Sequence, residues 1–244
     1  MPNIRARADV LKSFKKITAD QHEQLKRDGV ADKNYWSLNV GEHGKIVAVF
    51  KKEAKTHYYY RQGRMCCYCS KELDSHNGSF DAEHILDKDT YPQFMFLLEN
   101  IAAVCKTCNG SKSNKHVLVP GIATVDIPAN SNDYLLVHPH KDEWNDHLDY
   151  DGIGRIVAKP ENLKGRETIN ICGIQYLNSA RLADHFIDAD NELAEKALDG
   201  FFRVASRTWK LKYIRVLRKM VEEYDLSRAR AIIDVLEAEV ENIN

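Results

Sequence analysis

Apolar residues recur at helical spacing in two parts of the N-terminal quarter of the chain. The first set, which predicts a short helix within residues 4–27 that ends near Asp28-Gly29, consists of Val10, Leu11, Phe14 and Ile17. Residues 30–44 are expected to form a loop, with Gly41 and Gly44 as helix breakers. The second set of apolar positions predicts another helix over residues 45–62.

The pattern changes in the middle of the chain, where two short apolar runs precede a polar segment. Residues 80–85 and residues 101–105 are typical of strands, and a long loop separates them. Residues 106–115 are polar and suit a short helix. The predicted order is therefore strand, loop, strand, helix.

Beyond this region the chain first becomes rich in Gly, Pro, Asn and Asp and then turns helical. Residues 148–158 predict a hairpin around a central Asp-Gly turn. An apolar stripe from Leu182 to Phe201 predicts one long helix, and residues 211–224 and 229–240 predict two more. The C-terminal part should thus be a helical region that follows a loop and hairpin.

These elements together predict an α+β fold in three segments. Residues 1–63 form a helical N-terminal segment, residues 64–118 a small core, and residues 119–244 the loop, hairpin and helical C-terminal region. The fold is therefore expected to be a small two-strand core between predominantly α-helical flanks.

Charge and composition narrow the function classes. The 244 residues carry 35 basic and 36 acidic side chains, for a net charge of −1. A nucleic-acid-binding protein usually has a basic excess, so any such footprint must come from local clustering or from a partner. No apolar stretch is long enough to span a bilayer, and the N-terminus has no signal-peptide pattern, so we expect a cytoplasmic protein without membrane contact.

Six cysteines include two C-x-x-C pairs, a spacing that favours metal binding over disulfides. The predicted ligands of a structural Zn²⁺ ion are Cys66, Cys69, Cys105 and Cys108. Cys67 is an alternative to Cys66, although C-x-x-C is the commoner spacing. Because four thiolates close the coordination sphere, catalysis would need another metal. Cys172 stands apart and is expected to be a small buried apolar residue.

The residues between and after the cysteine pairs are of the types that a metal-dependent nuclease uses. Asp81-Ala82-Glu83-His84-Ile85 lies on the first predicted strand, followed by Asn100 and by Asn109 after the last cysteine. In this order and spacing the region from residue 66 to residue 116 resembles the HNH endonuclease family. It resembles the variant whose final letter is Asn, with a zinc-stapled ββα-metal core.

The chemistry of these residue types supports catalytic roles. His84 is the candidate general base, since a neutral imidazole can activate water. Glu83 and Asn109 offer oxygen ligands for a catalytic Mg²⁺ or Mn²⁺, and Asp81 is a further candidate ligand. Because Glu83 and His84 are neighbours on a strand, a twisted or bulged strand end is expected, so that both reach one phosphate.

The resemblance implies two further roles and a reaction. Asn100 would hold the loop between the strands by hydrogen bonds, so that His84 points at the phosphate. Lys112, one turn beyond the final Asn, would touch the phosphate. The cut would leave a 5′-phosphate, and double-stranded DNA is the expected substrate.

Basic residues with interleaved aromatic residues over residues 201–221 form a second candidate contact with nucleic acid. The candidate contacts are Arg207, Lys210 and Arg215. Such a basic amphipathic helix is also typical of a solvated surface or a protein-binding face. Lys51, Lys52 and Lys55, just before the core, allow the same alternatives.

The segments after the core are similar to the downstream part of HNH proteins from retron- and Septu-type bacterial anti-phage systems. They include Tyr134-Leu135-Leu136-Val137-His138-Pro139 and Gly165-Arg166-Glu167-Thr168-Ile169. This resemblance implies a nuclease effector that works beside an ATPase partner. Two alternatives stay open: a non-catalytic zinc-knuckle module that binds nucleic acid or protein, and a nuclease that cuts RNA such as tRNA.

Overall fold

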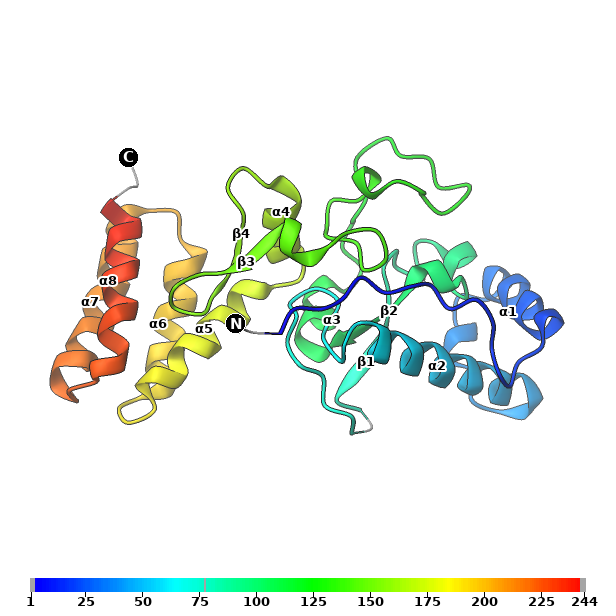
Figure 1. The fold of residues 1–244 in the computed structure, drawn as a ribbon, viewed down its shortest axis with the longest axis horizontal. Coiled ribbons are helices and arrows are strands. Elements are labelled where there is room, and N and C mark those ends of the chain that lie inside the picture. Colours follow the sequence, from blue (N-terminus) through cyan, green and yellow to red (C-terminus); the bar gives the residue numbers. More distant parts are fainter. Residues whose placement is uncertain (1–2, 77, 242–244) are drawn as a thin grey trace. The chain divides into compact units, whose positions relative to one another are not determined.

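The computed structural model describes residues 3–76 and 78–241, and its helices and strands are labelled in Figure 1. The chain divides into two compact units. The first takes in the chain up to Leu148 together with Ala158–Cys172, and the second takes in Asp149–Val157 and the chain from Gly173 onward. These units cut across the segments expected from the sequence, because part of the chain after residue 118 belongs to the unit that contains the core.

The fold class is confirmed as α+β. The two-stranded sheets are formed by β1 (Phe80–His84) with β2 (Ile101–Cys105), and by β3 (Leu148–Tyr150) with β4 (Ile156–Ala158). The helices of the described residues are α1 (Ala19–Ala31), α2 (Gly41–Arg61), α3 (Lys106–Lys112), α4 (Leu163–Ile171), α5 (Ile174–Ala183), α6 (Asn191–Arg203), α7 (Arg207–Glu223) and α8 (Ser227–Glu241). Across these residues, no helix combines the length and apolar character that a membrane crossing requires.

The first helix begins later than its apolar spacing predicts, and residues 3–18 are not helical. Thr18 caps α1, because its side chain accepts from the Gln21 backbone N–H while the Gln21 side chain accepts from the Thr18 N–H. The preceding backbone bonds to other parts of the unit, as when the Ala8 N–H donates to the Pro139 carbonyl at 3.1 Å. A helix is therefore present in the predicted region, but the apolar positions from Val10 to Ile17 lie before it, since tertiary bonds replace helical ones there.

Helix α2 begins at Gly41, and Gly44 lies inside it, so Gly44 is not a breaker. A Cβ at Gly44 would lie 2.7 Å from the backbone carbonyl carbon of Asn39. This glycine is needed because the entering chain passes against the helix. The predicted end of the helix at Gly63 is confirmed by its left-handed φ of +68° just after the C-cap.

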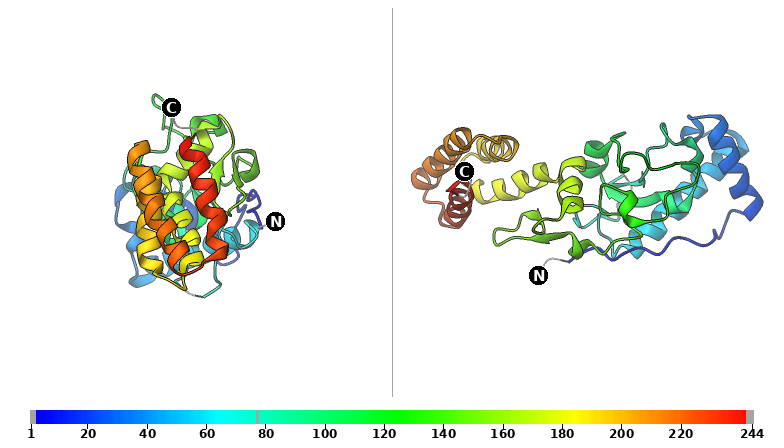
Figure 2. Two further views of the ribbon diagram at one scale, coloured as in Figure 1. Left: turned by 90° about the vertical axis from the view of Figure 1, so that its left-hand side faces the viewer. Right: turned by 90° about the horizontal axis from the view of Figure 1, so that it is seen from above.

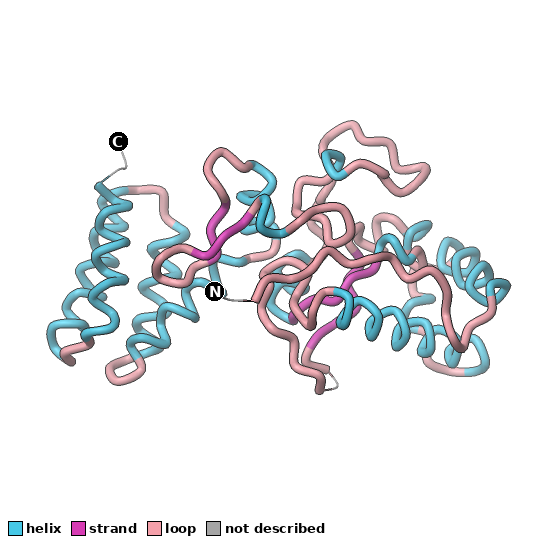
Figure 3. The backbone as a smooth tube through the Cα atoms, viewed as in Figure 1, coloured by secondary structure: helices cyan, strands magenta, loops and turns pink. Residues whose placement is uncertain are grey.

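The predicted strand–strand–helix core is confirmed. Strands β1 and β2 pair antiparallel in an unbroken register from Phe80 opposite Cys105 to His84 opposite Ile101. Helix α3 follows β2 directly. Between α3 and β3 the chain is mostly loop, interrupted by two short 3-10 helices (Figure 3). All residues of β2 are buried, and this strand packs against α2.

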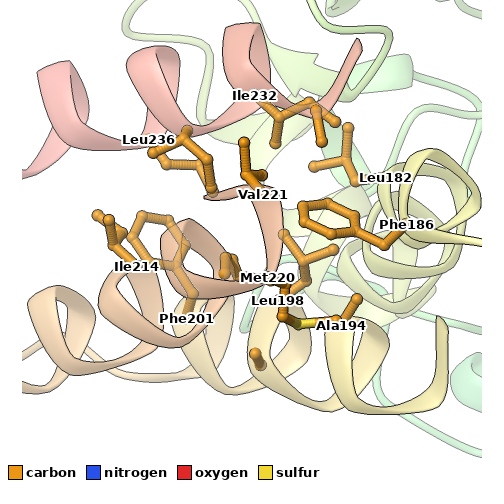
Figure 4. Packing of buried hydrophobic residues seen from close by; sticks show 14 of the residues in the cluster. Leu182, Phe186, Ala194, Leu198, Phe201, Ile214, Met220, Val221, Ile232 and Leu236 are labelled. Atoms are coloured by element: carbon orange, nitrogen blue, oxygen red, sulfur yellow. The ribbon is translucent and has the colours of Figure 1, made fainter. Parts of the chain in front are cut away.

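The single long helix expected from residue 182 to residue 201 was wrong. Helix α5 ends at Ala183 and is followed by a 3-10 turn that ends at Phe186. A new helix, α6, then begins after Asp190, whose side chain caps it by accepting from the Leu193 N–H. Leu193 is 44% exposed and does not belong to the buried stripe. The other two predicted helices correspond to α7 and α8. Helices α6, α7 and α8 lie side by side (Figure 2) around the apolar core of the second unit drawn in Figure 4.

Candidate metal and catalytic site

Four cysteine sulfurs converge where the loop before β1 meets the end of β2 and the start of α3. The Sγ atoms of Cys66, Cys69, Cys105 and Cys108 all lie within 4.8 Å of one another, and the residues are buried. A tetrahedral zinc ion with Zn–S bonds of ~2.3 Å holds its sulfurs ~3.8 Å apart. The Cys69 and Cys105 sulfurs are 3.8 Å apart, so this cluster could hold a metal ion such as zinc.

Hydrogen bonds within this cluster favour one thiolate, that of Cys66, and the same contacts raise the pKa values of Cys69 and Cys108. The Cys105 N–H donates to the Cys66 sulfur at 3.4 Å, and the Cys108 N–H donates to the Cys105 sulfur at 3.4 Å. Burial alone would raise the pKa of the Cys66 thiol, but hydrogen bonds from neighbouring cysteines hold it well below its usual value.

Cys67 lies outside the cluster, so the geometry favours Cys66 over Cys67 as the candidate ligand. Burial raises the pKa of the Cys67 thiol well above its usual value, which suits a neutral buried side chain. The backbone just after Cys67 is held by a residue distant in the sequence, because the Trp144 indole N–H donates to the Tyr68 carbonyl at 2.7 Å. Cys172 is also buried and outside the cluster, as the sequence predicted.

His84 ends β1 and lies in the wall of a pocket of about 480 Å³. Its Nε2 lies 2.9 Å from the Met95 carbonyl oxygen. Since a carbonyl only accepts, Nε2 carries the proton and Nδ1 keeps the lone pair. Burial lowers the pKa of His84 to about 3, so the ring is neutral at physiological pH. The rings of Trp36 and His84 pack edge to face, with centroids 4.3 Å apart.

Glu83 is nearly inaccessible and is paired within the protein. Its Oε1 lies 2.7 Å from Lys112 Nζ and accepts from the Tyr68 hydroxyl at 3.1 Å. Burial raises the pKa of Glu83, an effect that the neighbouring ammonium of Lys112 opposes. Both bonds fall on Oε1, and Glu83 belongs to the lining of the same pocket as His84. The two neighbours therefore line one pocket although the strand register contains no bulge.

Lys112 does not present its ammonium to a substrate in this structure. Its side chain is 1% exposed, and Nζ donates to the His84 carbonyl at 2.9 Å in addition to pairing with Glu83. The expected phosphate contact does not fit this burial. Lys112 instead links α3 to the end of β1 through these two contacts.

Asp81 and Asn109 form the more accessible polar pair of the site. The Asn109 Nδ2 donates to Asp81 Oδ2 at 2.8 Å, and the Lys106 ammonium bonds to the other carboxylate oxygen. Both residues line the pocket beside Glu83 and His84. The Asn109 carbonyl oxygen and the two carboxylates are hard ligands of the kind that Mg²⁺ and Mn²⁺ prefer.

Asn100 connects the two sides of the loop between the strands. Its Oδ1 accepts from the Leu86 N–H at 2.7 Å, and its Nδ2 donates to the carbonyls of Leu86 and Phe94 at 2.9 and 3.1 Å. The next residue after Phe94, Met95, supplies the carbonyl that fixes the His84 ring. The fully buried Asn100 amide thus orders the loop that orients His84.

Replacing Asn100 with aspartate is expected to destabilise the first unit by about 2–3 kcal/mol, since a carboxylate oxygen would face two carbonyls in place of a donor. Urea denaturation of the purified variant measures this effect. Asn39→Asp, at an exposed position, is the matched control and should change the unfolding free energy by less than about 0.5 kcal/mol. Equal midpoints for the two variants would contradict the role of Asn100.

The pocket also contains residues that the motif did not indicate. Trp36, from the 3-10 helix before α2, and Asp87 and Lys88, just after β1, line it. Lys51 and Lys55 of α2 line it as well, whereas Lys52 does not. The i, i+4 spacing of the two lysines was a signal for a shared face, but nothing in the sequence showed which face meets the pocket.

The basic residues predicted on the C-terminal helices differ in availability. In α7, the Arg207 Nε donates to the Val240 carbonyl at 3.3 Å, and the Lys210 Nζ donates to the Phe201 carbonyl at 2.9 Å. Both cations are therefore engaged in helix packing within the second unit. Arg215 is exposed and makes no hydrogen bond or ion pair with a described residue, so it remains available to a ligand.

Two curated proteins are similar to part of the chain. The Septu protein PtuB of Bacillus thuringiensis is 31% identical over 117 residues, which is 46% of this chain and 37% of PtuB. The Septu protein PtuA of Bacillus mycoides strain KBAB4 is 27% identical over 123 residues, which is 45% of this chain and 17% of PtuA. The chain thus spans about a third of the length of the first relative and about a sixth of the second. No family model matches the chain.

Proposed function

We propose that the protein is a metal-dependent HNH-type endonuclease that hydrolyses phosphodiester bonds, with double-stranded DNA as its substrate. The observation that carries this proposal is the pocket at the end of β1. One wall holds a neutral imidazole with an available Nδ1, and the same lining contains three carboxylates, an amide oxygen and several ammonium groups. A hydrolytic site for a phosphodiester needs this combination of a base, cation ligands and positive charge.

His84 is the general base in this proposal. Its protonated Nε2 is held by the Met95 carbonyl, so the lone pair on Nδ1 accepts the proton of the attacking water. Trp36 packs against the ring and Asn100 orders the loop that carries Met95. The imidazole is therefore held in one tautomer and one orientation before substrate arrives.

Asp81, Glu83 and Asn109 would hold a catalytic Mg²⁺ or Mn²⁺ ion. The side-chain oxygen Oδ1 of Asn109 and the second carboxylate oxygen of Glu83, Oε2, accept no hydrogen bond from a described residue, which suits them to be ligands. When bound, such an ion stabilises negative charge on the phosphate and on the leaving oxygen. The cysteine cluster would hold a separate structural Zn²⁺, because four thiolates leave no open position.

The similarity to two Septu proteins supports a role as the nuclease effector of a bacterial anti-phage defence system. An ATPase partner in the cytoplasm would then share substrate delivery and control. The net charge of −1 fits this arrangement, since the chain lacks the overall basic excess of a protein that binds nucleic acid alone.

Incubation of supercoiled plasmid with Mg²⁺ or Mn²⁺ tests the proposal. Cleavage is expected with the parent protein, and His84→Ala is expected to lower the rate about 10²–10⁴-fold because the general base is lost. The matched control is His76→Ala, which removes a histidine whose side chain is 87% exposed and outside the pocket. An RNA panel run beside the plasmid separates a DNase from an RNase.

The outcomes distinguish the alternatives. Equal cleavage by the His84 and His76 variants would overturn the assignment of His84 as the base. Binding of nucleic acid without cleavage by the parent protein, also in the presence of any ATPase encoded beside it, would identify a zinc-knuckle binding module instead. Cleavage of RNA but not of plasmid would replace DNA as the substrate.

A further inference from the structure

Two lysines of α2 bring positive charge to the pocket from outside the cysteine-bounded core. Lys51 and Lys55 are one helical turn apart, and both line the pocket that contains His84. Each ammonium lies over an aromatic ring: Lys51 Nζ is 4.8 Å from the Trp36 ring centroid, and Lys55 Nζ is 4.1 Å from the Phe80 centroid. The aromatic contacts therefore hold both lysine side chains along the wall of the pocket.

Neither of these ammonium groups forms a salt bridge with a carboxylate among the described residues. The other lysines near the site do have anionic partners, since Lys88 pairs with Asp89 and Lys112 with Glu83. Burial lowers the pKa of both Lys51 and Lys55, because partial loss of water disfavours the charged form. The nearby carboxylate of Asp81 opposes this effect at Lys55 without forming an ion pair with it. A partly dehydrated ammonium without an ion-pair partner is costly, and aromatic contact offsets only part of that cost.

We propose that Lys51 and Lys55 bind the backbone phosphates that flank the scissile bond, a role that rests on the nuclease function proposed above. Phosphate oxygens supply the ion-pair partners that the two ammonium groups lack. The contact is independent of base sequence, because it reaches only the backbone. Helix α2 thus supplies the side chains that bind the substrate phosphates, whereas β1 and α3 supply the catalytic side chains.

Lys52 provides a matched control on the same helix. It is exposed and lines a different depression, together with Glu53 and Tyr60. Substitution to methionine at each position removes the charge but keeps an unbranched side chain that can cover Trp36 or Phe80. Lys→Arg substitution keeps the charge and should restore binding if charge is what matters.

Equilibrium binding in a His84→Ala background tests the inference without cleavage of the probe. A labelled DNA duplex and an RNA hairpin are titrated with the full chain, and the probe that binds more tightly is used for all variants. Lys51→Met/Lys55→Met is expected to weaken binding at least about tenfold. It should also reduce the slope of log affinity against log salt by about 2, or about 0.9 for each lost phosphate contact.

Lys52→Met should change neither quantity, and Lys51→Arg/Lys55→Arg should remain close to the parent. A double methionine variant with unchanged affinity and salt slope would overturn the inference, even if the parent protein cleaves plasmid. A loss of binding in that variant, restored by arginine, would sustain the phosphate contact. Absence of cleavage by the parent would then overturn the catalytic proposal and the position at a scissile bond, and would leave the phosphate contact established. An unchanged urea midpoint of the double variant excludes misfolding as the cause.

Discussion

Replacing Cys66 with alanine is expected to strip the metal from the cysteine cluster and to unfold the unit that carries the pocket. Structural zinc contributes ~10–16 kcal/mol of binding free energy in zinc-finger peptides. That is as large as the whole stability of a typical domain, ~5–15 kcal/mol. The cluster joins the loop before β1 to the junction of β2 and α3, so its loss releases the elements that place His84 and Asn109.

Metal analysis of the purified protein and its thermal denaturation measure this effect. The parent is expected to carry one zinc ion per chain, and Cys66→Ala well below one. Cys67→Ala is the matched control, because it removes the adjacent buried thiol that lies outside the cluster. Retention of zinc by Cys66→Ala together with its loss in Cys67→Ala would reverse the assignment of the ligand.

Replacing Lys112 with methionine is expected to destabilise the first unit by about 3–5 kcal/mol. The change leaves Glu83 as a buried charge without its ammonium partner. Among the described residues, the Tyr68 hydroxyl then remains as the hydrogen-bond donor to this carboxylate. It also removes the donor to the His84 carbonyl. Urea denaturation monitored by circular dichroism gives the change in unfolding free energy.

Lys106→Met is the matched control for this change, since Lys106 pairs with Asp81 on the same core but its side chain is 57% exposed. Its cost should stay below about 1 kcal/mol, as for other surface ion pairs. Combining Lys112→Met with Glu83→Gln should recover part of the loss, because the uncompensated charge is then gone. Equal costs for Lys112→Met and Lys106→Met would show that the pair is not buried in solution.

The core was predictable because its signals are local. The two C-x-x-C pairs mark the metal cluster, and the short apolar runs between them correspond to β1 and β2 within one residue. The N-terminal segment was mispredicted because the apolar positions Phe14 and Ile17 pack through tertiary contacts, and periodicity alone does not distinguish these from helical packing. The break between α5 and α6 was missed for the same reason, since the stripe from Leu182 to Phe201 continues across a turn.

The sequence by itself determined the strand–strand–helix order, the cysteine cluster and the residue types around His84, because each depends on spacing along the chain. Only the tertiary structure decided the environment of each side chain. Cys66 lies in the cysteine cluster and Cys67 does not, and Lys112 is buried against Glu83. Lys51 and Lys55 line the pocket, whereas Lys52 lines a different depression. Burial, partners and charge depend on contacts between distant segments, such as α2 with β1, and these contacts are not encoded in local spacing.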